Sequence, residues 1–222
     1  MKSLVVLFNP NTSSTTTAEM VAIAHETARN WADVEGRTAD FGAPIIINPP
    51  DLDTASLAVD AFADRMAETG WPADAIVIGA FGDPGLAALR LRAPVPVVGI
   101  GESAIAEASA GGRPFSIVTT TPELETSIRR QVEGLGVCRQ LRSIRLTPGV
   151  PAEVMADADR LDRELGRLIS QVMAEDGAKA VLVAGGPLSA AARRLDLRFA
   201  PPIIDPVTTA LKRLGLMLRA AN

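Results

Sequence analysis

The amino-acid sequence predicts an α/β protein of two similar lobes, each built on a mainly parallel sheet. Short β-branched apolar runs alternate with helical patterns along the chain, as is typical of parallel α/β sheets. In the stretch 75–86, AIVIGAFGDPGL, an apolar run enters a glycine-rich turn that leads into a helical pattern. The stretch 180–190, AVLVAGGPLSA, repeats this plan about half a chain length later.

The first half of the chain is expected to alternate strands and helices in a regular order. Apolar runs predict strands at residues 3–8, 36–41, 75–78 and 96–100. Helical patterns cover residues 18–31, 54–69 and 103–110. The Ile-rich segment 44–50 is bounded by prolines, and we expect a loop there that forms part of a cleft wall.

The second half repeats this order. Strands are predicted at residues 115–118, 143–146, 180–183 and 202–204. Helices are predicted after Thr121, after Pro187, over 151–175 and over 208–220. We therefore expect a first lobe of residues 1–95 plus 208–222, a second lobe of residues 96–207, and an active-site cleft between them.

Polar side chains crowd the exits of two predicted strands. Asn11 and Thr12 follow the first strand, and Thr119 and Thr120 follow the strand at 115–118. Some of these side chains can simply cap the next helix. The surplus of amide and hydroxyl groups also suits a site for a carboxylate, carbonyl or phosphate, because the carboxyl ends of parallel strands open onto one crevice.

Composition excludes several classes of function. Of the 222 residues 22% are charged, and the net charge of −4 comes from intermixed signs, which argues against a nucleic-acid-binding surface. The single cysteine, Cys138, rules out an internal disulfide and a cysteine-rich zinc site. The single histidine, His25, argues against a histidine metal site or a catalytic triad, so we expect no metal.

The hydropathy pattern predicts a protein without a membrane partner. The apolar run at the N-terminus is too short for a secretory signal, and no run is long enough to span a bilayer. We therefore expect a cytoplasmic protein.

Five motifs, in this order, resemble the aspartate/glutamate racemase superfamily, with the hydantoin and allantoin racemases most similar: 9–12 NPNT, 81–86 FGDPGL, 96–102 PVVGIGE, 119–120 TT and 185–188 GGPL. The resemblance covers nearly the whole chain. It implies two flavodoxin-like three-layer lobes related by pseudo-twofold symmetry, with a cofactor-free active site between them. It also implies a homo-oligomer and a small-molecule substrate, which would be a hydantoin, a ureide or an amino-acid derivative.

The resemblance further implies proton transfer beside a carbonyl by two cysteines, one on each face of the substrate. The matching positions in this chain are Ala80 and Ala184, whose methyl groups can neither accept nor donate a proton. The residues that the resemblance places around the substrate are Asn11, Thr12, Phe81, Gly82, Thr119, Thr120, Gly185, Gly186 and Pro187.

Three functions are compatible with these residues. The first, favoured by the resemblance, is a racemase. Either its two cysteines have been deliberately replaced by alanine, or another group such as Asp83 or Glu102 acts as base, although both of these also suit positions at helix N-termini. The second is a lyase or decarboxylase, which needs at most one proton donor. The third is a non-catalytic protein that binds a small carboxylate, imide or ureide.

Overall fold

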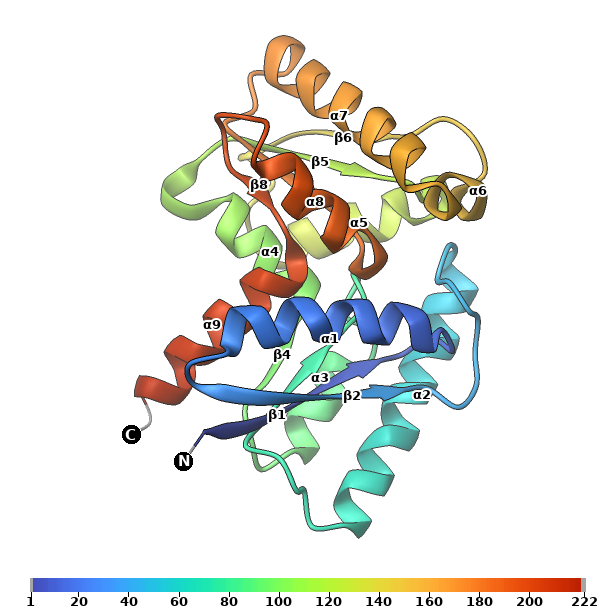
Figure 1. Cartoon of the computed structure of the whole chain (residues 1–222), viewed down its shortest axis with the longest axis vertical. Helices are drawn as coiled ribbons and strands as arrows, with labels where there is room; N and C mark the ends of the chain where they lie inside the picture. The colour runs from blue at the N-terminus through green and yellow to red at the C-terminus, as the bar shows by residue number, and fades with distance from the viewer. Residues whose placement is uncertain (1, 221–222) are drawn as a thin grey trace.

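The computed structural model describes residues 2–220 and contains two α/β lobes with the same strand order (Figure 1). The first sheet has the order β2-β1-β3-β4, with bounds β1 Ser3–Asn9, β2 Ala32–Thr38, β3 Ala75–Ile78 and β4 Val97–Gly99. The second has the order β6-β5-β7-β8, with bounds β5 Phe115–Thr119, β6 Leu141–Leu146, β7 Ala180–Val183 and β8 Ile203–Ile204. Every strand pair in these sheets is parallel, which confirms the predicted fold class.

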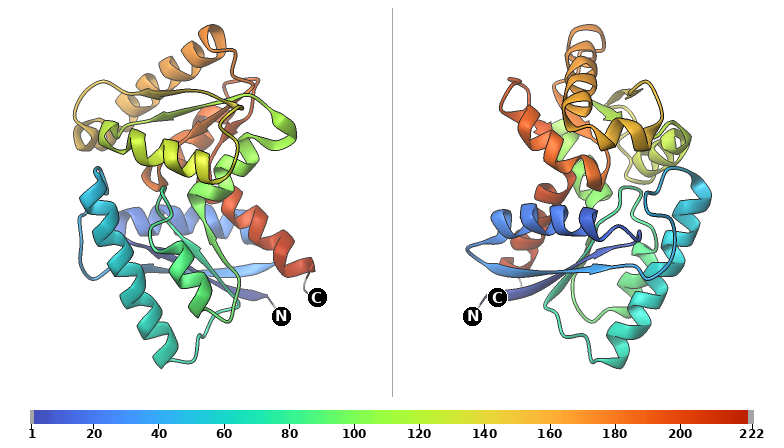
Figure 2. Two further views of the ribbon diagram at one scale, coloured as in Figure 1. Left: turned by 180° about the vertical axis from the view of Figure 1, so that it is seen from behind. Right: turned by 45° about the vertical axis from the view of Figure 1, so that its right-hand side comes forward.

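Helices cover both faces of the first sheet. On one face α1 (Ser14–Ala28) and α9 (Pro206–Ala220) pack against alternate apolar residues of β1 and β3. On the opposite face α2 (Pro49–Glu68) and α3 (Leu86–Arg92) bury the other set of strand residues, and Figure 2 shows this side from behind. The strands are apolar on both faces because each face has its own helical layer.

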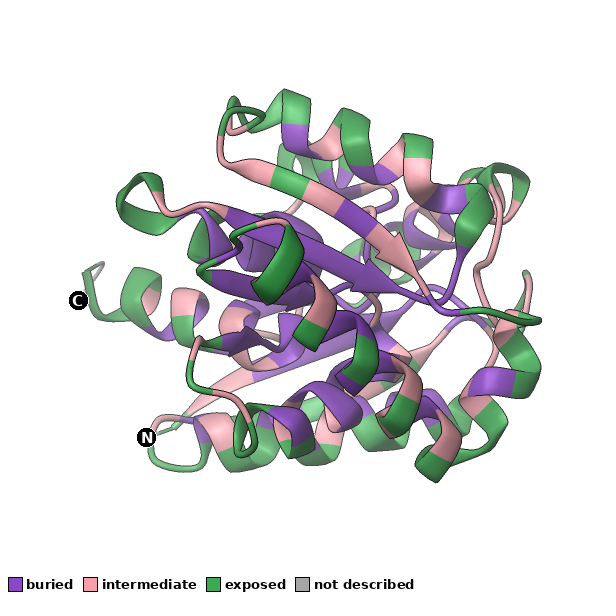
Figure 3. Cartoon of the chain, turned by 90° about the horizontal axis from the view of Figure 1, so that it is seen from above, coloured by how far each residue is buried: buried purple, intermediate pink, exposed green. Residues whose placement is uncertain are grey.

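The second lobe has the same three layers. One face packs against α4 (Ile100–Ala108) and α5 (Glu125–Gly134). The other face packs against α7 (Ala158–Glu175) and α8 (Ser189–Asp196), with the short α6 (Pro151–Ala156) beside them. The remaining helical elements are the 3₁₀ turns η1 (Ala110–Gly112), η2 (Pro122–Leu124) and η3 (Gly186–Leu188). In both lobes the buried residues lie on the strands and on the helix faces that pack against them (Figure 3).

Capping residues move several helix boundaries away from the predicted positions. Ser13 accepts a hydrogen bond from the N–H of Thr16, so α1 begins four residues before residue 18. Asn48 caps α2 in the same way, and the helix begins at Pro49, where proline is tolerated. The single helix predicted over 151–175 is broken at Asp157, which caps α7.

The strand β4 belongs to the first sheet, which therefore runs past the lobe boundary expected after residue 95. Val97 pairs with Ile76 and Gly99 pairs with Ile78, so the first sheet extends to Gly99. The strand predicted at 36–41 also shifts, because β2 pairs along the whole of β1 and covers 32–38. Within residues 2–220, no helix is long and apolar enough to cross a membrane.

The helix α4 is shared by the two lobes. Ile100 lies in the core of the first lobe, whereas Ala104, Ile105 and Ala108 lie in the core of the second. On its polar side, Glu102 accepts hydrogen bonds from Arg90 on α3 and Arg213 on α9. This carboxylate therefore ties three helices together where the chain passes between the lobes.

Removing the charge of Glu102 is expected to destabilise the fold. The side chain of Glu102 is 11% exposed and faces two arginines that are 38% and 41% exposed, so Glu102→Gln leaves both partly buried cations without a counter-charge. We expect the free energy of unfolding to fall by about 2 kcal/mol, between the values for surface and buried pairs. Urea denaturation measures this change.

Glu107 on the same helix is the matched control. Its side chain is 54% exposed and lies 3.6 Å from Arg113, so Glu107→Gln should cost less than about 1 kcal/mol. Equal losses for the two variants would contradict a special role for Glu102.

Candidate functional site

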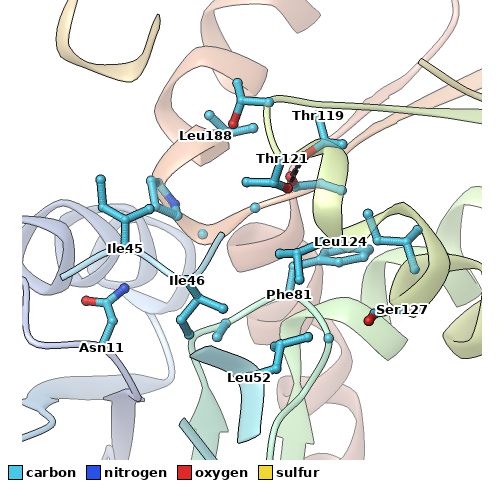
Figure 4. Close-up of a pocket in the computed structure, with 18 of the residues that line it drawn as sticks. Asn11, Ile45, Ile46, Leu52, Phe81, Thr119, Thr121, Leu124, Ser127 and Leu188 are labelled. Carbon is cyan, nitrogen blue, oxygen red and sulfur yellow. Dashed lines mark hydrogen bonds between the residues drawn. The ribbon is translucent and has the colours of Figure 1, made fainter. Parts of the chain in front are cut away.

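A cavity lies at the carboxyl ends of the strands, where the two lobes face one another (Figure 4). Its volume of about 50 Å³ is enough for a few water molecules, and the cavity is partly open to solvent, so a larger ligand would extend toward its mouth. The first lobe contributes Asn11, Ile45, Ile46, Leu52, Gly79, Ala80, Phe81 and Gly82. The second lobe contributes Thr119, Thr120, Thr121, Leu124, Ser127, Ile128, Met155, Ala184, Gly185, Gly186, Pro187 and Leu188.

Asn11 supplies the polar group of the first lobe. Its Oδ1 accepts hydrogen bonds from Asn9 Nδ2 (2.8 Å) and from the N–H of Ser13 (2.9 Å). The amide is therefore held by its oxygen, and its NH₂ group is turned toward Ile46 (Figure 4). Thr12, which the sequence places in the site, is not among the lining residues; its N–H donates to the carbonyl of Ala43 at 3.1 Å.

Threonines supply the polar groups of the second lobe. Thr119 Oγ1 donates to the carbonyl of Ala184 at 2.8 Å and lies 3.3 Å from Thr121 Oγ1. This bond ties the end of β5 to the turn after β7. Thr119 and Thr120 are both 1% exposed, so their hydroxyl groups can serve only the cavity and its walls.

The glycines at the turns allow the two lobes to touch. A Cβ on Gly186 would lie 2.7 Å from the carbonyl oxygen of Gly79 and 2.8 Å from Met20 Sδ, so only glycine fits without displacing the backbone of the first lobe. Gly185 has φ +145°, which side chains rarely permit. This approach brings Ala80 and Ala184 to the same cavity, where they are 7% and 3% exposed.

The cavity lining contains no titratable side chain among the described residues. The two acids considered as replacement bases serve structural contacts instead. Asp83 was expected to cap the helix that follows it, but Gly85 holds that position, and the Asp83 carboxylate binds the N–H groups of Gly101 and Glu102 on α4. Glu102 pairs with the arginines described above.

The other titratable candidates also lie elsewhere. Cys138 is exposed between α5 and β6 and does not line the cavity, and His25 lies on α1 away from the lining. Within residues 2–220, no group of three or more histidine, cysteine, aspartate or glutamate side chains could hold a metal ion.

The apolar wall is larger than the sequence suggested. The loop predicted over 44–50 does line the cavity, through Ile45 and Ile46. The apolar lining residues that the sequence did not predict come from the helical segments, namely Leu52, Leu124, Ile128, Met155 and Leu188. Their sequence pattern is that of ordinary core residues, and Ser127 carried no signal at all.

Comparisons with known proteins agree with this geometry. The family model described as Asp/Glu/Hydantoin racemase matches residues 5–214. The hydantoin racemase of Rhizobium meliloti is 31% identical over 96% of this chain and 88% of the relative. The hydantoin racemase of Paenarthrobacter aurescens is 29% identical over 98% of this chain and 94% of the relative.

A solved structure shows the same fold over the whole chain. The allantoin racemase from Klebsiella pneumoniae superposes with a TM-score of 0.92 at 27% identity, covering 99% of this chain and 89% of that protein. The matched family and the two-lobed cavity lead to one conclusion: this chain belongs to the Asp/Glu/Hydantoin racemase family.

Proposed function

We propose that the cavity binds a small neutral cyclic imide or ureide, of which a 5-substituted hydantoin with an apolar substituent is the best example, and that this chain does not racemise it through paired thiols. The observation that carries the proposal is the absence of any titratable side chain among the described residues lining the cavity. Racemisation needs a base on one face of the substrate and an acid on the other.

The positions that the family resemblance gives for these groups hold Ala80 and Ala184. Neither methyl group transfers protons, and threonine and serine hydroxyls are far too weak as acids or bases to replace thiols near neutral pH. Decarboxylation would also leave a carbanion that needs a proton donor. Among the functions compatible with the sequence, binding without proton transfer therefore fits this cavity best.

The chemistry of the lining favours a neutral ligand with a hydrocarbon substituent. A charged amino acid would lose its hydration without meeting a counter-charge, which is costly. The NH₂ group of Asn11 and the hydroxyls of Thr120 and Ser127 can bond the carbonyl and N–H groups of a planar ring, and Thr119 Oγ1, whose proton goes to Ala184, can accept a bond from a ring N–H. The isoleucine and leucine walls suit an alkyl group better than the polar ureido group of allantoin.

Ligand binding is expected without catalysis. We predict that 5-isobutylhydantoin raises the melting temperature of the protein, by mass action on the folded state, more than allantoin, aspartate or glutamate does. In deuterated buffer, proton NMR should show exchange of the hydantoin α-proton no faster than in buffer alone. Exchange that rises in proportion to protein concentration would contradict the proposal and indicate another base.

Restoring thiols should create the missing chemistry. In the double variant Ala80→Cys with Ala184→Cys, each turn would bring one thiol to the cavity in which the ring is proposed to bind. We expect loss of optical rotation of 5-isobutylhydantoin at least about 100 times faster than with the unchanged protein. Either substitution alone should allow proton exchange at most.

The control places a thiol in a buried site away from the cavity. Ala192→Cys does this on α8, where the alanine is 0% exposed, and should leave the rate unchanged. A folded double variant that binds the hydantoin but does not racemise it would contradict the assignment of Ala80 and Ala184 as the reacting positions.

A further inference from the structure

Asp83 directly follows the turn Ala80–Gly82 that lines the cavity, yet its own side chain points away to other partners. Its φ of +50° is unusual for a residue other than glycine. In this conformation the carboxylate leaves the β3–α3 connection and reaches α4 and α5. A residue other than glycine stays at positive φ only where the surrounding contacts hold its backbone in that conformation.

Three N–H groups converge on the Asp83 carboxylate. Oδ1 accepts from the backbone of Gly101 at 2.8 Å, and Oδ2 accepts from the backbone of Glu102 at 2.6 Å and from Gln131 Nε2 at 2.7 Å. Two nearby glycines leave room for this network, because a Cβ on Gly99 would displace the carboxylate and one on Gly101 would displace the Gln131 amide. The backbone at the start of α4 therefore leaves space for the Asp83 carboxylate.

Gln131 connects Asp83 to the opposite wall of the cavity. It lies on α5 one turn after Ser127 and Ile128, which line the cavity from the second lobe. The Oε1 of Gln131 is buried and has no hydrogen-bond partner among the described residues. Burying an unpaired oxygen is unfavourable, so this side chain must gain stability from its other end. The bond from Nε2 to Asp83 supplies that gain.

We propose that Asp83 is a positioning residue that clamps the turn Ala80–Gly82 of the first lobe to α5 of the second and thereby sets the width of the cavity. This inference rests on the proposed binding function of the same cavity. The clamp joins the two walls without touching the ligand.

The charge state of Asp83 gives the clamp a measurable pH dependence. Burial raises the pKa of Asp83 to about 7, while the N–H groups of Gly101 and Glu102 and the charge of Arg90 lower it and the charge of Glu102 raises it. Glu102 is itself paired with Arg90 and Arg213. Below neutral pH Asp83 becomes protonated, and the oxygen that carries the proton accepts hydrogen bonds less well. The clamp is then weaker, so ligand affinity should fall as the pH drops from 8 to 6.

The test uses Gln131→Met, which removes one bond to Asp83 while retaining the length of the side chain. We expect the Kd for 5-isobutylhydantoin, measured by calorimetry at pH 8, to rise about tenfold, equivalent to about 1.4 kcal/mol. Without ligand, amide hydrogen exchange in residues 79–89 should become faster. Asp83→Asn should also weaken binding, and its Kd should no longer change between pH 8 and 6.

Gln140→Met is the matched control, since Gln140 is also half-buried with an unpartnered Oε1, whereas it is Gln131 whose amide donates to Asp83. It should leave both the Kd and the exchange unchanged. If the unchanged protein does not bind the hydantoin, the proposed function fails, but faster exchange in Gln131→Met would still support the clamp. Unchanged exchange in Gln131→Met, or faster exchange with an unchanged Kd, would overturn it.

Discussion

The two lobes meet backbone to backbone at their glycine-rich turns, and this contact fixes the geometry around the cavity. Gly186 lies so close to the carbonyl of Gly79 that a methyl group would not fit between them. Each lobe has its strand ends on the side where the turns meet, so the contact gathers the exits of β1, β3, β5 and β7 around one small space. A larger residue at Gly186 would separate the lobes and enlarge that space.

Charged groups lie beside the cavity and not in it. Asp83 binds the start of α4, and Glu102 pairs with Arg90 and Arg213 in the layer behind the turns. Inside the cavity the polar groups are neutral amides and hydroxyls. Charges in this region therefore hold the lobes together, whereas the cavity offers hydrogen bonds and apolar contact.

The fold and the chemistry of a site depend on different groups. Sheet order, lobe contact and threonine-lined turns depend on backbone packing and on hydrogen bonds such as that from Thr119 to Ala184. Proton transfer depends on only a few side chains that contribute little to packing. Ala80 and Ala184 are both buried where the turns meet, so their methyl groups are part of that packing.

The sequence by itself determined the parallel two-lobed fold and most of the turns that meet at the cavity. The spacing of apolar residues, the glycine-rich turns and the internal repeat can all be recognised along the chain without knowing which segments contact one another. It did not determine that β4 pairs with β3, that Thr12 is not among the residues lining the cavity, or that Asp83 binds the start of α4 instead of capping its own helix. Nor did it identify Ile128 and Met155 as cavity walls. Strand partners and side-chain contacts between segments distant in sequence arise only when the layers pack, so the tertiary structure alone decided them.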